Sequence, residues 1–481
     1  MNSPSSPKEA DKDEIGRRFE EQLATAFALR SSTKAQREDK LIRLRDSLFA
    51  RRNELYEAFA IDFQKPALEV ELTELLPVID EIRHALKSLS KWMRPIRAQS
   101  NITTLGTSAY IAYQPKGRCL IIGPWNYPVN TVLGPLVSAV AAGNTVIVKP
   151  SELTPSVNKV IANIIEDVFI PQEVTVIEGG SLTAQTLLDL PFDHIFFTGS
   201  PSIGKIVMAA ASRHLTSVTL ELGGKSPTIV DETADLTRAA EVIMWGKLLN
   251  AGQTCVAPDY VLVHHSVHDE FVSCCKKIIQ ERFGSTNEQL RSSASLSRMI
   301  NINHTARVGK LITDAVDAGA SIFYGGTYNE AECYVAPTLL GKIPASAKIT
   351  NEEIFGPVLP IFSYELINEV IDKINSAPKP LALYIWSRNK NVIRRVLEKT
   401  SSGGACINHC VQQYAHSGLP FGGVNHSGIG NAHGYYGFKA FSHERSVLRG
   451  SWLLLVRAFF PPYTPAKLQL TKMLVNILRR I

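Results

Sequence analysis

The segment 195–205, IFFTGSPSIGK, joins a short apolar run to a glycine-containing turn and the beginning of a predicted helix. We expect residues 195–197 to form a buried strand and the residues after the turn to be helical. Gly199, Ser200 and Gly204 would line the turn at the amino terminus of this helix, where backbone N–H groups favour an anion. The segment therefore predicts a strand–turn–helix unit that binds phosphate.

The spacing of this turn also matches the first part of a P-loop, GxxxxGK. A P-loop continues with Ser or Thr to hold magnesium, but this chain has Ile206. The GxGxxG spacing of a standard dinucleotide turn is absent as well. A phosphotransferase is therefore the weaker interpretation, and a glycine turn alone can be a simple tight turn.

Four further apolar runs surround this unit, separated by stretches with helical patterns. Such alternation predicts a parallel sheet covered on both faces, with ligands at the carboxyl ends of its strands. The five predicted strands are 119–122, 145–148, 173–177, 194–197 and 217–220. A second α/β pattern begins after Gly224, with expected strands at 228–230, 260–264, 381–385 and 405–408.

Composition limits the class of protein. The 481 residues are 45% hydrophobic and 20% charged, which is typical of a globular protein with large cores. The net charge of +6 is spread along the chain, so nucleic-acid binding is not expected. The seven cysteines lack zinc-type spacing, so neither a metal site nor a disulfide framework is predicted. No leader or long apolar run is present, and we expect a cytoplasmic protein.

Two motifs contain candidate catalytic side chains. Residues 250–259 (NAGQTCVAPD) hold Cys255, and residues 220–225 (LELGGK) hold Glu221. A thiolate is a strong nucleophile, and a carboxylate can take a proton from the thiol or from water. Without their motifs, a single Cys is more often a buried apolar residue and a single Glu is usually solvated.

Other polar residues follow the predicted strands. Asn126, in 124–128 (PWNYP), has an amide that can donate to an oxyanion, or it lies in an ordinary turn. Lys149 and Glu152, in KPSE, suit ribose hydroxyls or a solvated loop. Glu353 and Phe355 offer a carboxylate beside an aromatic ring, or a helix end with a core side chain.

The motifs PWN, KPSE, FTGS…G, LELGGKSP, GQTC, EEIFGP and LPFGG occur in one order. In this order, over residues 16–450, the chain resembles the aldehyde dehydrogenase superfamily. The segments 257–260, 380–384 and 442–444 resemble its class 3 branch, which oxidises fatty and aromatic aldehydes. The resemblance implies NAD(P)-dependent oxidation of an aldehyde to a carboxylic acid through a cysteine thiohemiacetal and thioester.

The resemblance also implies roles for individual residues. Cys255 would be the nucleophile, Asn126 and the Cys255 N–H the oxyanion donors, and Glu221 the base for the hydrolytic water. The cofactor would contact Trp125, and also Lys149 and Glu152 (adenosine ribose), Gly199, Ser200 and Gly204 (pyrophosphate), Glu353 (nicotinamide ribose), Phe355 (ring) and the Leu222 carbonyl (carboxamide).

The implied fold is α/β, with two doubly wound domains and a small β arm. The expected parts are a disordered start (1–15), an NAD(P)-binding domain (16–102 and 115–220), a catalytic domain (221–420), an oligomerisation arm and bridging segment (103–114 and 421–450) and an amphipathic tail (451–481). The arm and the segment after Phe438 are expected to pair across the two-fold axis of a homodimer, since edge strands need partners.

Substrate and cofactor stay open in part. Asn425 stands where the superfamily usually has Gly, and residues 411–416 match no substrate pattern. Medium- or long-chain aliphatic aldehydes are the leading expectation, and an aromatic, coniferyl-type aldehyde is the alternative. Glu152 would repel a 2′-phosphate, which favours NAD over NADP. Because Cys255, Glu221 and Asn126 occur together, a catalytically inactive homologue is disfavoured.

The tail has an apolar stripe at helical spacing, Leu470, Met473, Leu474, Ile477, Leu478 and Ile481, with basic residues between. One interpretation is that the stripe packs on a dimer partner or covers the substrate mouth. The other is an interfacial helix held peripherally on the anionic inner surface of a membrane.

Overall fold

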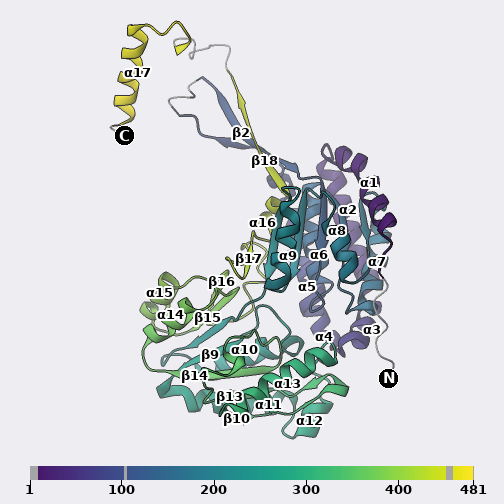
Figure 1. The fold of residues 1–481 in the computed structure, drawn as a ribbon, viewed down its shortest axis with the longest axis vertical. Helices are drawn as coiled ribbons and strands as arrows, with labels where there is room; N and C mark the ends of the chain where they lie inside the picture. The colour runs from purple at the N-terminus through teal and green to yellow at the C-terminus, as the bar shows by residue number, and fades with distance from the viewer. Residues whose placement is uncertain (1–8, 102–103, 105, 451–458, 480–481) are drawn as a thin grey trace.

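The computed structural model describes residues 9–479 of the chain, apart from 102–103, 105 and 451–458. Figure 1 shows two α/β domains, with a narrow β arm and a terminal helix extending away from them. The predicted disordered start, 1–15, is wrong in its last part. Helix α1 begins at Lys12, and Ile15 is already buried against the first domain. Residues 1–8 lie outside the described part of the chain.

Helices precede the first sheet. Thr33 and Gln36 form a reciprocal capping box at the start of the second helix, which satisfies backbone N–H groups there. The elements are α1 (Lys12–Leu29), α2 (Lys34–Ala50), α3 (Arg52–Phe63), α4 (Ala67–Val70), the π-helical turn η1 (Glu71–Leu75) and α5 (Leu76–Trp92).

The first domain is built on a six-stranded sheet with the order β17-β7-β6-β3-β4-β5. All five predicted strands are present and parallel, which confirms the expected α/β class, while β17 pairs antiparallel at the edge. The strands are β3 (Arg118–Ile122), β4 (Thr145–Lys149), β5 (Val174–Val176), β6 (His194–Gly199), β7 (Ser217–Leu222) and β17 (Gly428–Ile429).

Alternate side chains of these strands enter two different cores. Cys119 and Ile121 pack with α2, α3 and α5–α7, whereas Leu120 and Ile122 pack with α1, α8 and α9. Each fully buried aliphatic side chain contributes about 1.5–3 kcal/mol, so burial on both faces fixes the sheet. The covering helices are α6 (Asn130–Ala142), α7 (Pro155–Val168), α8 (Ser181–Leu188) and α9 (Pro201–Ser212).

The second domain has a seven-stranded sheet with the order β10-β13-β14-β9-β8-β15-β16, in which only β10 is antiparallel to its neighbour. The strands are β8 (Pro227–Val230), β9 (Tyr260–His264), β10 (Ser321–Tyr324), β13 (Thr338–Gly341), β14 (Val358–Tyr364), β15 (Ala382–Trp386) and β16 (Gly404–Ile407). The helices are α10 (Leu236–Leu248), α11 (His268–Phe283), α12 (Asn287–Ser292), α13 (Ile302–Asp317), α14 (Ile367–Ser376) and α15 (Lys390–Lys399).

Two details of this domain differ from the prediction. Strands β10, β13 and β14 have no counterpart among the expected strands. The expected domain boundary at 221 is also displaced, because β7 continues to Leu222 and places Glu221 in the first sheet.

The arm is a three-stranded antiparallel sheet of β1 (Ile96–Ala98), β2 (Ser108–Pro115) and β18 (Ser442–Arg449). Strand β18 pairs with β2 along its whole length. The two segments expected to form the arm therefore pair with each other within one chain, and β1 and β18 remain its edge strands. Pairing of the arm across a two-fold axis stays a prediction. Helix α16 (Gly434–Ala440) leads into β18, and α17 (Pro465–Leu478) lies beyond the arm (Figure 1). In the described parts of the chain, no helix is both long and apolar enough to cross a membrane.

Candidate active site

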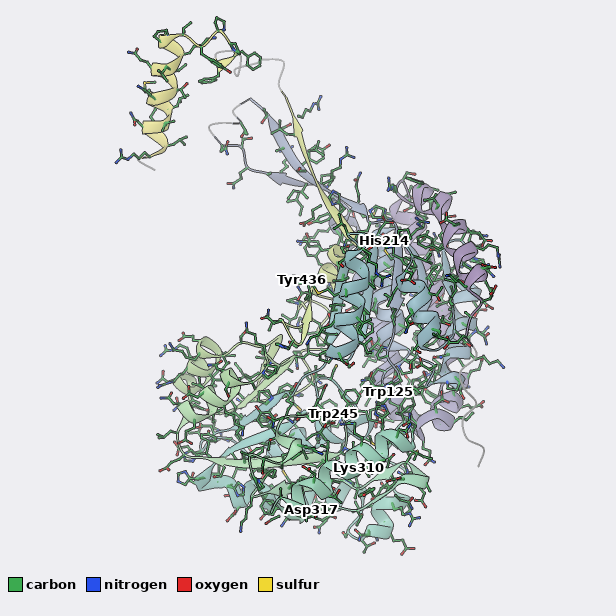
Figure 2. All side chains as sticks on the ribbon, in the orientation of Figure 1. Trp125, His214, Trp245, Lys310, Asp317 and Tyr436 are labelled. Carbon is green, nitrogen blue, oxygen red and sulfur yellow. The ribbon has the colours of Figure 1, made fainter. Side chains whose placement is uncertain are left out.

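A cavity of about 710 Å³ lies where the two domains meet. Figure 2 shows Trp125 and Trp245 at this junction. Nine of the twelve predicted site residues line the cavity: Trp125, Asn126, Gly199, Ser200, Glu221, Leu222, Cys255, Glu353 and Phe355. The first sheet supplies the carboxyl ends of its strands, as expected for a parallel α/β fold. The other three residues, Lys149, Glu152 and Gly204, lie outside its lining.

The loop before Cys255 is held in an uncommon conformation. Asn250 and Ala251 both have φ of 52°, in the left-handed region that non-glycine residues rarely adopt. Gly252 has φ of 76°, and a Cβ there would clash with the Gly356 carbonyl oxygen. The N–H of Asn250 donates to Glu69 Oε1 over 2.7 Å. Contacts from both domains therefore impose the loop geometry, a kind of strain that is frequent at functional sites.

Gln253 fixes the same loop from inside. Its Nε2 donates to the carbonyls of Asn250 (3.0 Å) and Arg298 (3.1 Å), and its Oε1 accepts from the Ile300 N–H over 2.9 Å. The hydroxyls of Tyr127 and Thr254 lie 2.5 Å apart. The residues immediately before Cys255 are thus anchored on both sides, which sets the position of the sulfur.

Asn126 is oriented toward this loop. Its Nδ2 donates to the Gln253 carbonyl over 3.0 Å, and its backbone carbonyl accepts from Asn250 Nδ2 over 2.7 Å. A primary amide has two N–H groups, so this contact fixes the side chain and the second N–H can be donated to an oxygen beside Cys255.

The thiol of Cys255 is protonated in this environment. Burial raises its pKa to about 12, and the negative charges of Glu353 and Glu221 act in the same direction. The backbone N–H groups of Cys255 and Val256 oppose the rise. Formation of the nucleophilic thiolate therefore requires a proton acceptor or an added positive charge.

Glu221, which lines the same cavity as Cys255, can be such an acceptor in its ionised form. The side chain is buried on β7, and burial raises its pKa well above the ordinary value. Among the residues that the structure describes, neither carboxylate oxygen has a hydrogen-bond partner. A buried carboxyl without a structural partner is costly to maintain and is free to take a proton from a thiol or a water molecule.

The side of the cavity at the amino terminus of α9 holds Gly199 and Ser200, two of the residues predicted to contact a pyrophosphate. Ser200 caps α9 by accepting from the Ile203 N–H over 3.4 Å, so the helix amino terminus lies at the cavity wall. A Cβ on Gly204 would lie 2.6 Å from the Leu222 side chain, so only glycine allows α9 to pack this closely on β7. A Cβ on Gly223 would likewise clash with the Glu353 carboxylate.

Lys149 and Glu152 lie together at the end of β4. Lys149 Nζ donates to the Pro150 carbonyl over 3.0 Å and to Glu152 Oε2 over 3.2 Å. This pair is therefore placed to present a cation and a carboxylate at the same edge of the sheet.

Two aromatic rings and a carboxyl lie near the predicted nicotinamide position. The rings of Trp125 and Phe355 have their centroids 5.4 Å apart. Burial raises the pKa of Glu353 to about 7, and the negative charge of Asp259 acts in the same direction. The Gly224 N–H opposes the rise, so near neutral pH this carboxyl is present in both protonation states.

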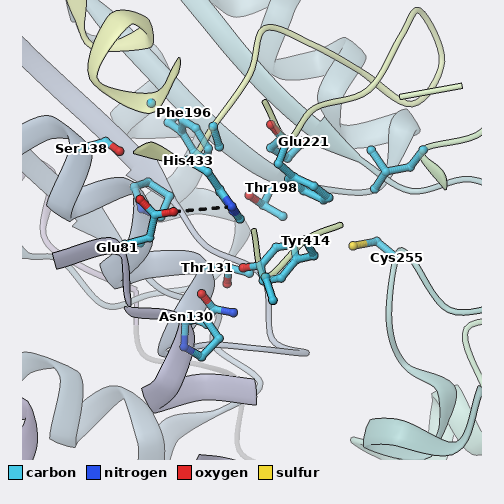
Figure 3. A pocket seen from close by; sticks show the side chains of 18 of the residues that line it. Glu81, Asn130, Thr131, Ser138, Phe196, Thr198, Glu221, Cys255, Tyr414 and His433 are labelled. Carbon is cyan, nitrogen blue, oxygen red and sulfur yellow. Dashed lines mark ion pairs between the residues drawn. The ribbon is translucent and has the colours of Figure 1, made fainter. Parts of the chain in front are cut away.

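The remaining wall of the cavity was not predicted as a site. It is largely apolar and comes from separate segments of the chain: Leu72, Leu76, Tyr127, Trp245, Leu249 and Val411. Tyr414 also lines it, within the segment 411–416 that the sequence singles out without a role. A smaller cavity continues behind Glu221 and holds Glu81 and His433 (Figure 3). Neither residue has a sequence motif that would reveal it.

Comparison with known proteins gives concordant matches. Residues 5–447 match the aldehyde dehydrogenase family. The 4,4'-diaponeurosporen-aldehyde dehydrogenase of Staphylococcus aureus (strain NCTC 8325 / PS 47) is 43% identical over 89% of this chain and 92% of its own length. Aldehyde dehydrogenase family 3 member A2 of Mus musculus is 40% identical over 89% and 87%, respectively.

Solved structures agree with these sequence matches. The substrate-bound state of Staphylococcus aureus AldH superposes with a TM-score of 0.91 at 40% identity, covering 96% of this chain and 99% of that one. An NAD⁺ complex of an aldehyde dehydrogenase from Bacillus cereus superposes with a TM-score of 0.83 at 26% identity, covering 92% and 90%.

Proposed function

Since the chain belongs to the aldehyde dehydrogenase family, we propose that its substrates are medium- or long-chain aliphatic aldehydes, which it oxidises to carboxylic acids with NAD. NAD(P)-dependent aldehyde oxidation is the activity of the family. The apolar wall of the cavity, with Leu72, Leu76 and Leu249, is the observation that supports an aliphatic chain. Burial of each CH₂ group contributes about 0.8 kcal/mol, so longer chains gain affinity there.

The chemistry assigned to the residues follows from their environments. Cys255 loses its proton to Glu221 or to water, and the sulfur attacks the aldehyde carbon. The Asn126 amide and the Cys255 N–H donate to the oxyanion that forms. NAD(P), when bound, supplies the hydride acceptor. Glu221 then takes a proton from the water that attacks the Cys255 thioester, the C–S bond breaks and the carboxylic acid leaves.

The assignment of cofactor contacts is part of the same proposal. Gly199, Ser200 and Gly204 would hold the pyrophosphate, the Leu222 carbonyl the carboxamide, and Glu353 the nicotinamide ribose beside Phe355 and Trp125. Lys149 and Glu152 would hold the adenosine ribose. Because a carboxylate repels a 2′-phosphate, we expect Glu152→Gln to raise kcat/KM for NADP relative to NAD. An unchanged ratio would contradict NAD selection by Glu152.

A panel of aldehydes tests the substrate class. For unbranched aldehydes we expect kcat/KM to rise with chain length until the apolar wall is filled. Benzaldehyde and coniferaldehyde are the comparison, since the rings of Tyr127 and Trp245 also line the cavity. A preference for these aromatic aldehydes over decanal would reject the aliphatic assignment.

Assembly and location complete the proposal. We propose that the protein is a homodimer. Light scattering tests this, and a stable monomer at micromolar concentration would contradict it.

We also propose that α17 contacts an anionic membrane surface peripherally. None of its described residues is buried, Lys467, Lys472 and Arg479 are basic, and residues 451–481 contain no Asp or Glu. Packing of α17 on a dimer partner is the other outcome of its test.

A further inference from the structure

The small cavity behind Glu221 has a largely apolar lining that also holds polar side chains not used in the proposed chemistry. Its volume is about 50 Å³, enough for about three to five water molecules at about 10–15 Å³ each. Figure 3 shows how the side chains surround it, with Glu221 and Cys255 on one side and Glu81 on the other. The polar lining includes Glu81, Asn130, Thr131, Ser138, Thr198 and His433.

Thr198 connects this cavity to the proposed base. It lies on β6 directly opposite Glu221 on β7 in the strand register, so both side chains project from the same face of the sheet. Figure 3 shows Thr198 between Glu221 and His433. A threonine hydroxyl both donates and accepts hydrogen bonds, so it can pass a proton between groups on its two sides, directly or through water.

Glu81 and His433 form a buried pair at the far side. His433 Nδ1 lies 3.6 Å from Glu81 Oε1, and Glu81 Oε2 accepts from the Gly434 N–H over 2.8 Å. His433 has φ of 72°, a strained value for a residue with a side chain. The rings of Phe421 and Tyr414, with centroids 5.2 and 4.7 Å from the imidazole, hold it in place. Strain and ring contacts together fix the imidazole facing the cavity.

The charge states of this pair suit proton transfer. Burial, with a smaller contribution from Asp80, raises the pKa of Glu81 to about 7, while the Gly434 N–H opposes the rise. Burial lowers the pKa of His433 to about 4, and a hydrogen bond to the Tyr414 backbone opposes this change. The imidazole is therefore neutral, and it can accept a proton at one nitrogen as it gives one up at the other. The other ionisable groups facing the pair are His84, beside Gly434, and Tyr414.

We propose that Glu81 and His433 form a proton relay that removes the proton taken up by Glu221 during thioester hydrolysis. This inference rests on the proposed role of Glu221. Water loses a proton to the Glu221 carboxylate as its oxygen bonds to the thioester carbon, and the C–S bond breaks. The proton then moves from Glu221 through Thr198 or cavity water to His433, and from the other imidazole nitrogen to Glu81. Glu221 is thereby returned to its basic form.

Asp80, next to Glu81 in the chain, brings the cavity lining close to the surface. Asp80 also lines the cavity, and its partly exposed carboxylate pairs over 2.6 Å with Arg83, whose side chain is 81% exposed. The cavity lining therefore reaches a partly exposed carboxylate on the same helix as Glu81. Neither relay residue lines the larger cavity that holds the predicted site residues, so both would act through Glu221.

The test separates acylation from deacylation with Glu81→Gln, which keeps an acceptor for the Gly434 N–H but cannot carry a proton. We expect a burst of about one NADH per site at the wild-type rate, followed by steady turnover about tenfold slower. His433→Asn, a residue tolerated at positive φ, should behave alike. Hydroxylamine, which attacks the thioester without needing a strong base, should restore turnover in both variants.

Asp62→Asn is the matched control. Asp62 also has a pKa raised by burial and accepts a backbone N–H, that of Val157 over 3.0 Å, but it lies outside the cavity. Its turnover should equal that of the wild type. Equal slowing of burst and turnover in Glu81→Gln, failure of hydroxylamine to restore it, or wild-type turnover would overturn the relay. If Glu221→Gln also deacylates normally, the proposed role of Glu221 fails instead.

Discussion

The loop that carries Cys255 and the terminal helix α17 differ in how their side chains are fixed by the rest of the chain. In the loop, Asn250, Gln253 and Thr254 each have partners at 2.5–3.1 Å, and two backbone positions are strained. In α17 no described residue is buried. The expected role of the loop therefore depends on the precise positions of its atoms. The expected role of the helix depends on its apolar and basic composition.

This difference separates two kinds of experimental effect. A change at the loop alters the position or charge of atoms that react, so it should change rates by orders of magnitude. A change in α17 alters only the proposed attachment of the protein to a surface, so it should leave the rate of the reaction unchanged. A variant that showed the reverse would break this distinction.

The largest effect is expected for Cys255→Ala. Without the sulfur no covalent intermediate forms, so aldehyde oxidation should fall below detection while NAD binding, measured by protein fluorescence, stays close to that of the wild type. Cys274→Ala, on α11 and outside the cavity, is the matched control and should retain full activity. Substantial turnover in Cys255→Ala would remove the thiol from the mechanism.

Glu221→Gln should give the next largest loss. General-base catalysis contributes on the order of 10²–10⁴ in rate, and here the loss should fall on hydrolysis of the thioester. The expected stopped-flow trace is a rapid burst of NADH followed by slow turnover. A trace without a burst would instead assign Glu221 to removal of the proton from Cys255.

Asn126→Ala removes one oxyanion donor and one contact to the Gln253 carbonyl. Loss of such a donor costs on the order of 10²–10³ in rate by comparison with other oxyanion holes. The burst rate should fall, because the oxyanion forms before hydride leaves. Unaltered acylation in this variant would show that the amide serves only the loop.

Alkylation of the cofactor-free enzyme should show the raised pKa of Cys255 directly. Because that pKa is about 12, the thiolate fraction and the rate with iodoacetamide should rise about tenfold per pH unit from pH 8 to 10. An ordinary thiol, with a pKa of about 8.5, would level off over this range. Peptide mapping identifies the alkylation of Cys255 among the other cysteines. If its alkylation rate levelled off below pH 9, the pKa would not be raised by burial and by the charges of Glu353 and Glu221.

The same contrast explains what the sequence could predict. The strands of the first sheet are continuous apolar runs such as 119–122 and 145–148, so the local sequence alone predicts their burial. Strand β14 escapes prediction because Pro360 interrupts it, and proline normally argues against a central strand. Strand β13 has only four residues, and β10 is an antiparallel edge.

The site shows the same limit. Cys255, Glu221 and Asn126 could be named because they lie in ordered motifs. Glu81 could not, since its partner N–H at Gly434 is 353 positions away and no local pattern joins them. The apolar cavity wall likewise combines residues from 72 to 411 that only the fold brings together.

The smallest effect on turnover is expected for the tail. A chain ending at Gly450 should oxidise a water-soluble aldehyde with unchanged kcat/KM but lose binding to anionic vesicles in co-sedimentation. Reversing Lys467, Lys472 and Arg479 to Glu in the full chain keeps the helix length and changes only its charge. At about 1 kcal/mol for each basic residue near an anionic surface, removing three favourable charges weakens vesicle binding by about 100-fold or more.

The matched control is Lys277→Glu on α11, an equally basic position on the body with a side chain 74% exposed, which should leave vesicle binding unchanged. Binding of the wild type should weaken with added salt, because surface charges are screened over a Debye length of about 10 Å at 0.1 M. Equal sedimentation of the full and shortened chains would reject the membrane contact. If the shortened chain also changed from dimer to monomer, the apolar stripe would pack on a partner subunit. The role of α17 would then depend on specific packing contacts, as the role of the Cys255 loop does.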